Sequence, residues 1–79
     1  MKNGERSLIS AKDIVKEFNI SYQIVNNYTD LGLLDVVTKK SRKRMYDYKE
    51  VKKRLNKITA LLSEGYTLRL IHKKLMGKI

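Results

Sequence analysis

The chain has 79 residues, no cysteine or proline and a single histidine, and its 18 lysines and arginines against eight acidic residues give a net charge of +10. A chain of this length folds as one small domain with a modest core and has no room for a deep active-site cavity. Without cysteine there are no disulfides, zinc–thiolate sites or cysteine nucleophiles, and one histidine with few carboxylates gives no basis for a metal site. The excess of positive charge indicates a polyanionic partner.

The positive charge is concentrated in one quarter of the chain. Ten lysines and arginines lie between Lys39 and Lys57, where only Asp47 and Glu50 oppose them. No apolar run approaches the roughly 18–20 residues of a membrane span, and the polar N-terminus lacks the apolar stretch of a signal peptide. We therefore expect a cytoplasmic protein with a flexible tail over residues 1–7 and one domain over residues 8–79.

A first helix is predicted at about residues 11–18. Ile9, Ile14, Val15 and Phe18 recur at helical spacing, and a serine just before the helix is a natural N-cap. We expect a short turn at residues 19–20, after which a second helix begins.

The second helix is predicted at about residues 22–31, with Ser21 as its cap and Gly32 as the residue that ends it. Ile24, Val25, Tyr28 and Leu31 form its apolar side. The other side carries hydrogen-bonding groups in place of ordinary surface charges, namely Tyr22, Gln23, Asn26, Asn27 and Asp30. Two helices joined by a short turn, the second exposing amides, are typical of a helix-turn-helix.

A basic β-hairpin is predicted at about residues 36–46. The β-branched residues at its start and Tyr46 at its end favour two short strands. The segment between them has no glycine and no two-residue turn signature, so we expect a longer, looser loop at the tip. Next to a helix-turn-helix, such a hairpin is typical of a wing. Its basic residues are Lys39, Lys40, Arg42, Lys43 and Arg44.

A third helix is predicted at about residues 48–64 and a fourth at about residues 68–76. Asp47 and Thr67 are their caps, and Gly65 ends the third helix. The side chains expected to face the core are Val51, Leu55, Ile58 and Leu62 in the third helix and Leu68, Ile71 and Leu75 in the fourth. The predicted fold is mostly α with a small β-hairpin wing, a winged helix-turn-helix.

Five segments, in this order and spacing, resemble the N-terminal DNA-binding domain of the MerR family of transcription regulators, over about Leu8 to Leu75. They are Asp13–Ser21 for the family's first helix and turn, Val25–Tyr28 for its Leu-Arg-Tyr-Tyr run, Leu31–Leu34 for its Glu-Gly-Leu-Leu stop, Arg44–Asp47 for its Arg-Leu-Tyr-Asp strand, and Leu61–Leu68 for its Leu-Gly-Phe-Ser-Leu element. The resemblance implies a winged helix-turn-helix that binds operator DNA.

The chain departs from the family pattern at the residues expected to touch DNA. Asn26 and Asn27 stand where the family has arginine and tyrosine, and Arg42 and Lys43 replace the usual Gly-Tyr before the wing arginine, which Arg44 matches. We therefore expect a different base preference or a different mode of backbone contact. The resemblance also implies that two copies pair through a long helix after the fourth, with an effector-binding region beyond it, and we expect neither within these 79 residues.

Sequence-specific binding of double-stranded DNA is the function that the pattern and the resemblance both predict. We expect the second helix in the major groove and the wing on phosphates or in an adjacent minor groove. The expected DNA-binding residues are Ser21, Tyr22, Gln23, Asn26, Asn27, Lys39, Lys40, Arg42, Lys43 and Arg44. No acid–base pair, activated nucleophile or phosphate-binding glycine loop is visible, so we expect no enzymatic activity, no cofactor, no metal and no small-molecule effector site.

Other functions fit the same composition. A small architectural protein, similar to an excisionase, would bind repeated sites cooperatively and bend DNA. An RNA-binding protein would expose stacking aromatics, for which only Tyr22 and Tyr48 are candidates. A membrane-surface protein would need an apolar face outside the core. We expect a transcription regulator of the bacterial nucleoid, with a second copy of the chain as a further partner through dimerisation or stacking along DNA.

Overall fold

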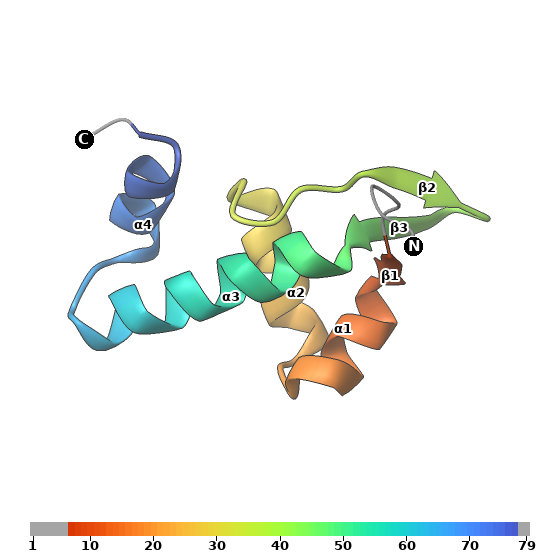
Figure 1. Cartoon of the computed structure of the whole chain (residues 1–79), viewed down its shortest axis with the longest axis horizontal. Coiled ribbons are helices and arrows are strands. Elements are labelled where there is room, and N and C mark those ends of the chain that lie inside the picture. Colours follow the sequence, from red (N-terminus) through yellow and green to blue (C-terminus); the bar gives the residue numbers. More distant parts are fainter. Residues whose placement is uncertain (1–6, 78–79) are drawn as a thin grey trace.

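The computed structural model describes residues 7–77, and in this range it contains four helices and one three-stranded antiparallel sheet (Figure 1). In chain order the elements are β1 (Leu8–Ser10), α1 (Ala11–Phe18), α2 (Tyr22–Asp30), β2 (Thr38–Lys40), β3 (Lys43–Asp47), α3 (Tyr48–Ser63) and α4 (Leu68–Leu75). The predicted winged helix-turn-helix is confirmed, and each helix ends within one residue of its predicted limit. Except for Ser7, the predicted flexible tail lies outside the described residues.

Each helix begins at the side chain that the sequence marks as its cap. The hydroxyls of Ser10, Ser21 and Thr67 each accept a hydrogen bond, at 3.1–3.2 Å, from the backbone N–H three residues further on. The carboxylate of Asp47 accepts one from the N–H of Lys49 at 3.2 Å. Because losing such a cap costs about 1 kcal/mol, these four residues fix where the helices start.

The core lies where the first three helices and the sheet meet, and α4 closes it at the far end of α3 (Figure 1). Every described helix and strand contributes to it except β2, whose three residues are all exposed. The buried apolar side chains are Ile9, Ala11, Ile14, Val25, Leu33, Leu34, Tyr46, Val51, Leu55, Ile58, Leu61 and Ile71.

The predicted apolar sides of α2 and α3 are partly wrong. Leu62 is 41% exposed, and its neighbour Leu61 is buried in its place. The chain reverses there to reach α4, with the N–H of Tyr66 bonded to the carbonyl of Leu61 at 3.0 Å, so the final turn of α3 presents a different residue to the core. Ile24 in α2 and Leu31 at its C-cap are also exposed, because the side of the helix that carries Val25 faces the core.

Ile9 lies in a strand, and its assignment to the helical pattern is wrong. In β1 it pairs with Tyr46 of β3, which is the central strand of the sheet, with β2 on its other side. The third strand was missed because three residues carry too little pattern to be recognised, and β1 forms only through pairing with a segment nearly forty residues away. It anchors the base of the wing to the start of α1.

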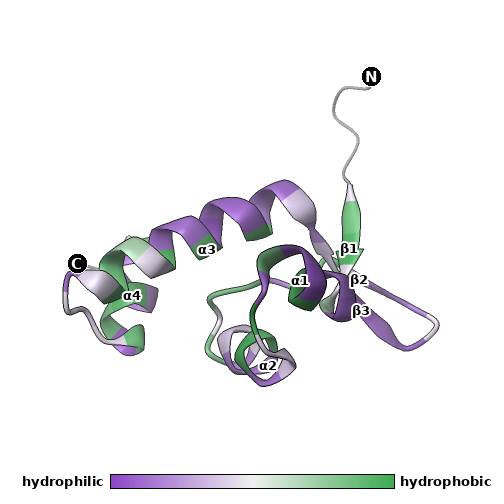
Figure 2. Cartoon of the chain, turned by 90° about the horizontal axis from the view of Figure 1, so that it is seen from below, coloured by the Kyte–Doolittle hydropathy of each residue, from purple (hydrophilic) through white to green (hydrophobic). Residues whose placement is uncertain are grey.

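The tip of the wing is a two-residue turn, Ser41–Arg42, and the predicted longer loop is wrong. Both residues have positive φ angles, 49° and 67°, as a type I′ turn requires, and Lys40 pairs with Lys43 directly beside them. This turn matches the right-handed twist of the two strands, but for residues with a side chain it costs roughly 1–2 kcal/mol each. Figure 2 shows the hairpin as a mostly hydrophilic projection beyond the helices.

The end of α2 is fixed against α3 and α4. Gly32 has a φ of +82°, and a Cβ there would lie 2.9 Å from Nε2 of His72 in α4. On the other side, Nη1 of Arg54 in α3 donates a hydrogen bond to the carbonyl of Leu33 at 2.8 Å. These contacts hold the segment between α2 and the wing, so the second helix is supported at its C-terminal end as well as at its cap.

Candidate nucleic-acid interface

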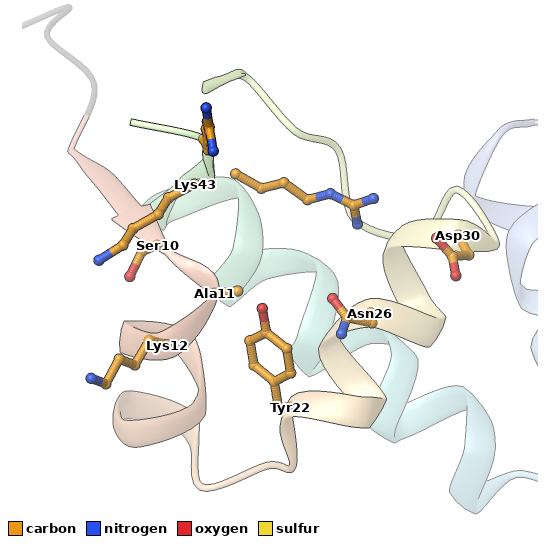
Figure 3. Close-up of a pocket in the computed structure, with 9 residues that line it drawn as sticks. Ser10, Ala11, Lys12, Tyr22, Asn26, Asp30 and Lys43 are labelled. Atoms are coloured by element: carbon orange, nitrogen blue, oxygen red, sulfur yellow. The ribbon is translucent and has the colours of Figure 1, made fainter. Parts of the chain in front are cut away.

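A groove of about 830 Å³ lies between the wing and the first two helices (Figure 3). Three parts of the chain line it: Ser10, Ala11 and Lys12 at the start of α1; Tyr22, Asn26 and Asp30 on α2; and Arg42, Lys43 and Arg44 on the wing. The fold therefore brings the polar side of the second helix and the basic hairpin to the same opening, although they are about twenty residues apart in the sequence.

The α2 wall of this groove is a regular stripe. Tyr22, Asn26 and Asp30 are four residues apart, so they lie on one side of the helix. The Tyr22 side chain is 55% exposed, and Figure 3 shows its hydroxyl directed towards Ala11. Beside the stripe is a shallow depression lined by Gln23, Ile24, Asn26, Asn27 and Asp30. The three carboxamide residues of α2, Gln23, Asn26 and Asn27, thus line two adjoining hollows.

The wing carries like charges opposite one another. Lys39 pairs with Arg44, and Lys40 pairs with Lys43, across the antiparallel ladder. Directly opposed like charges destabilise a two-stranded ladder, and no acidic residue lies between Thr38 and Arg44 to offset them. A bound polyanion would relieve this repulsion, so the hairpin is electrostatically better suited to the bound state than to the free one.

Two partly buried hydroxyls hold the wing in place relative to α2. The Thr29 hydroxyl donates its single hydrogen to the carbonyl of Val25 at 2.7 Å. The contact of 2.8 Å between the Thr29 and Tyr46 hydroxyls therefore has Tyr46 as the donor. Successive strand residues alternate in direction, so Arg44 leaves β3 on the same side as the buried Tyr46. One side of β3 thus fixes the strand to α2 and also aims Arg44 at the groove.

Four cations and one carboxylate line the groove, the cations being Lys12, Arg42, Lys43 and Arg44. Arg54, although in the same basic part of the sequence, does not add to this charge. Its side chain is 16% exposed and pairs with Glu50 at 3.2 Å and with Asp35 at 3.7 Å. The free positive charge at this end of the molecule therefore comes from the wing and the start of α1.

Comparison with protein families gives a match over residues 9–78 to the MerR HTH family regulatory protein model. The chain belongs to this family. Comparisons with curated proteins and with solved structures gave no significant match. Members of the MerR HTH family are DNA-binding regulators, so the partner of this domain is DNA, and the observed fold and basic groove agree with that activity.

The groove of this MerR-family domain contains five of the ten residues predicted to bind DNA: Tyr22, Asn26, Arg42, Lys43 and Arg44. Gln23 and Asn27 line the adjoining depression, and Ser21 is the cap of α2. Lys39 and Lys40 are exposed on β2 but line neither hollow. All ten therefore remain candidates for DNA contact, with seven of them in two adjoining hollows.

Lys12 and Asp30 line the groove and were not predicted as contacts. Lys12 comes directly after the start of α1, and only the pairing of β1 with β3 brings it near the wing. Asp30 did appear in the polar pattern of α2, and its four-residue spacing from Asn26 was the signal that could have identified it.

The second candidate for stacking on bases, Tyr48, already makes contacts within the domain. Its ring lies 5.8 Å from that of Phe18, centre to centre, and its hydroxyl donates a hydrogen bond to Glu17 at 3.2 Å. This bond raises the pKa of Tyr48, and burial raises the pKa of Tyr28.

Within residues 7–77, no helix is long and apolar enough to cross a membrane, and no three potential metal-ligating side chains gather at one point.

Proposed function

We propose that this domain binds double-stranded DNA sequence-specifically, with α2 in the major groove and the wing on the backbone and in the adjacent minor groove. The observation that carries the proposal is the shared opening between α2 and the wing, where Asn26 and three wing cations line one groove. The major groove is wide enough to admit a helix, and the cations of the wing can bind the phosphates of the backbone.

The carboxamide side chains of α2 are the base-reading groups in this proposal. Gln23, Asn26 and Asn27 lie in adjoining hollows, and a carboxamide pairs bidentately with N6 and N7 of adenine. Ser21 and Tyr22 stand at the N-terminus of the helix, whose partial positive charge favours a phosphate. We therefore assign base recognition to the middle of α2 and phosphate contact to its start.

The five basic residues of the wing supply affinity in this proposal. Lysines and arginines that neutralise phosphates release condensed counterions, and this release makes binding strong and dependent on salt. An arginine that enters a narrow minor groove would in addition read DNA shape. One domain offers a single recognition helix, so we expect it to bind a half-site, with a second copy providing specificity by dimerisation or by stacking along repeated sites.

The proposal is tested by fluorescence anisotropy with a labelled random duplex, the matching single strand and a structured RNA, each over a range of salt concentrations. We expect the duplex to bind most tightly, with a steep linear fall of log K against log salt concentration. Equal or tighter binding to RNA or to the single strand would contradict docking in the grooves of duplex DNA.

Asn26→Ala is expected to weaken binding to the preferred site, once selected from random duplexes, more than binding to random DNA. A good bidentate contact contributes roughly 1–3 kcal/mol of discrimination, so the ratio of the two affinities should fall at least about fivefold. Thr59→Ala, an exposed change on α3, is the control. Equal losses on both duplexes would remove Asn26 from base recognition.

A further inference from the structure

Asp30 is the one acidic residue that lines the groove between α2 and the wing. It is the last residue of α2, and Figure 3 shows it at the end of the stripe that begins with Tyr22. Its side chain is exposed, and among the described residues it has no hydrogen bond and no ion pair. Asp30 also lines the adjoining depression, so it faces both of the hollows that α2 presents.

No hydrogen bond or ion pair among the described residues accounts for a carboxylate at this position. The C-terminal end of a helix carries partial negative charge, so an acidic side chain there is unfavourable. A carboxylate in a groove that faces DNA also repels phosphates. Several other acidic side chains have structural partners: Asp35 and Glu50 pair with Arg54, Glu17 accepts from Tyr48, and Asp47 caps α3. Asp30 thus opposes both the dipole of its own helix and the general attraction of the groove to DNA.

We propose that Asp30 is a specificity-determining residue that accepts a hydrogen bond from the N4 amino group of a cytosine in the major groove. An ionised carboxylate only accepts hydrogen bonds, and guanine and thymine present acceptors there, which would repel it. Adenine offers its N6 amino group beside the N7 acceptor, so the second carboxylate oxygen would face a lone pair. Cytosine itself presents only the N4 amino group and no acceptor in the major groove. The inference rests on the proposed docking of α2 in the major groove.

The position of the cytosine follows from the helix geometry. Asp30 is four residues beyond Asn26, which is about 6 Å along the helix axis, and base pairs are spaced about 3.4 Å apart. With α2 lying along the major groove, Asp30 and Asn26 should therefore read base pairs about two steps apart. The cytosine requirement is expected at that distance from the position that Asn26→Ala relaxes.

The test begins with selection of the preferred duplex by the unmodified protein, followed by affinity measurements on every single-base variant of that site. Asp30→Asn keeps the size of the side chain, removes the charge and adds a donor. Glu64→Gln makes the same change in net charge at the exposed C-cap of α3, outside both hollows. Thermal unfolding of both variants shows whether the domain stays folded, and Asp30→Asn should not lower the midpoint.

We expect Asp30→Asn to bind random duplex severalfold more tightly and to lose at least about fivefold of the preference for cytosine at one position. Glu64→Gln should leave the base preferences unchanged. If Asp30→Asn retains every base preference of the unmodified protein, or alters only positions where cytosine is not preferred, the inference is overturned. If the unmodified protein shows no preference for duplex DNA, the proposed function itself fails, and the two failures are thereby distinguished.

Discussion

Tyr46→Ala is expected to remove most of the stability of the domain. Tyr46 is fully buried and is the central strand's main contribution to the core, where it lies between β1 and α2. Truncating a large buried aromatic costs about 3–5 kcal/mol, and the whole stability of so small a domain is on the order of 5 kcal/mol. Urea unfolding followed by circular dichroism measures the loss.

Tyr46→Phe measures the contribution of the hydroxyl to stability apart from that of the ring. It keeps the packing but removes the donor to Thr29, so we expect a loss of only about 1 kcal/mol. Tyr22→Ala is the matched control, because this tyrosine is 55% exposed and its truncation should change stability by no more than about 0.5 kcal/mol. A Tyr46→Ala protein that unfolds at the same urea concentration as the unmodified one would show that β3 does not hold the core together.

Local chemistry made the helices predictable from the sequence. Each start is determined by a side chain that bonds to a backbone N–H three residues or fewer away, as at Ser21 and Asp47, so the information lies in a few adjacent residues. The Arg44–Asp47 segment was recognisable from its resemblance to the Arg-Leu-Tyr-Asp strand of the MerR family. The order of these local signals was sufficient to predict a winged helix-turn-helix.

The errors arose where the outcome depends on distant partners. Ile9 fits a helical spacing, but the ladder with β3 places it in a strand. Leu61 and Leu62 are equally apolar and adjacent, and only the packing of α4 decides between them. At the wing tip, strand twist imposes positive φ on Ser41 and Arg42 although neither is glycine. In each case a tertiary requirement decides what the local sequence does not.

The residues of the candidate interface also divide into those that local sequence identifies and those that depend on distant contacts. Residue type and spacing identified the amides of α2 and the charges of the wing, because both are dense local patterns. The sequence did not show that Lys12 joins them, since its place in the groove depends on β1 pairing with β3. Several elements form the groove together, so residues at its edge such as Lys12 can be identified only when the fold is known.

Removing three wing charges, with Arg42→Asn, Lys43→Gln and Arg44→Gln in one protein, is expected to reduce duplex affinity by about two orders of magnitude near physiological salt. Each phosphate contact adds about 0.9 to the slope of log K against log salt concentration, so the slope should fall by up to about 2.7. Asparagine tolerates the positive φ at position 42. Anisotropy with a random duplex at several salt concentrations measures both quantities.

The free variant should be at least as stable as the unmodified protein, because the substitutions remove the repulsion of Lys39 with Arg44 and of Lys40 with Lys43. A loss of DNA binding without a loss of stability separates a contact role from a structural one. The matched control replaces Lys52, Lys53 and Lys57 with glutamine, three exposed charges on α3 outside the groove. If this control loses as much affinity and slope as the wing variant, net charge alone drives binding and the wing is not a specific contact surface.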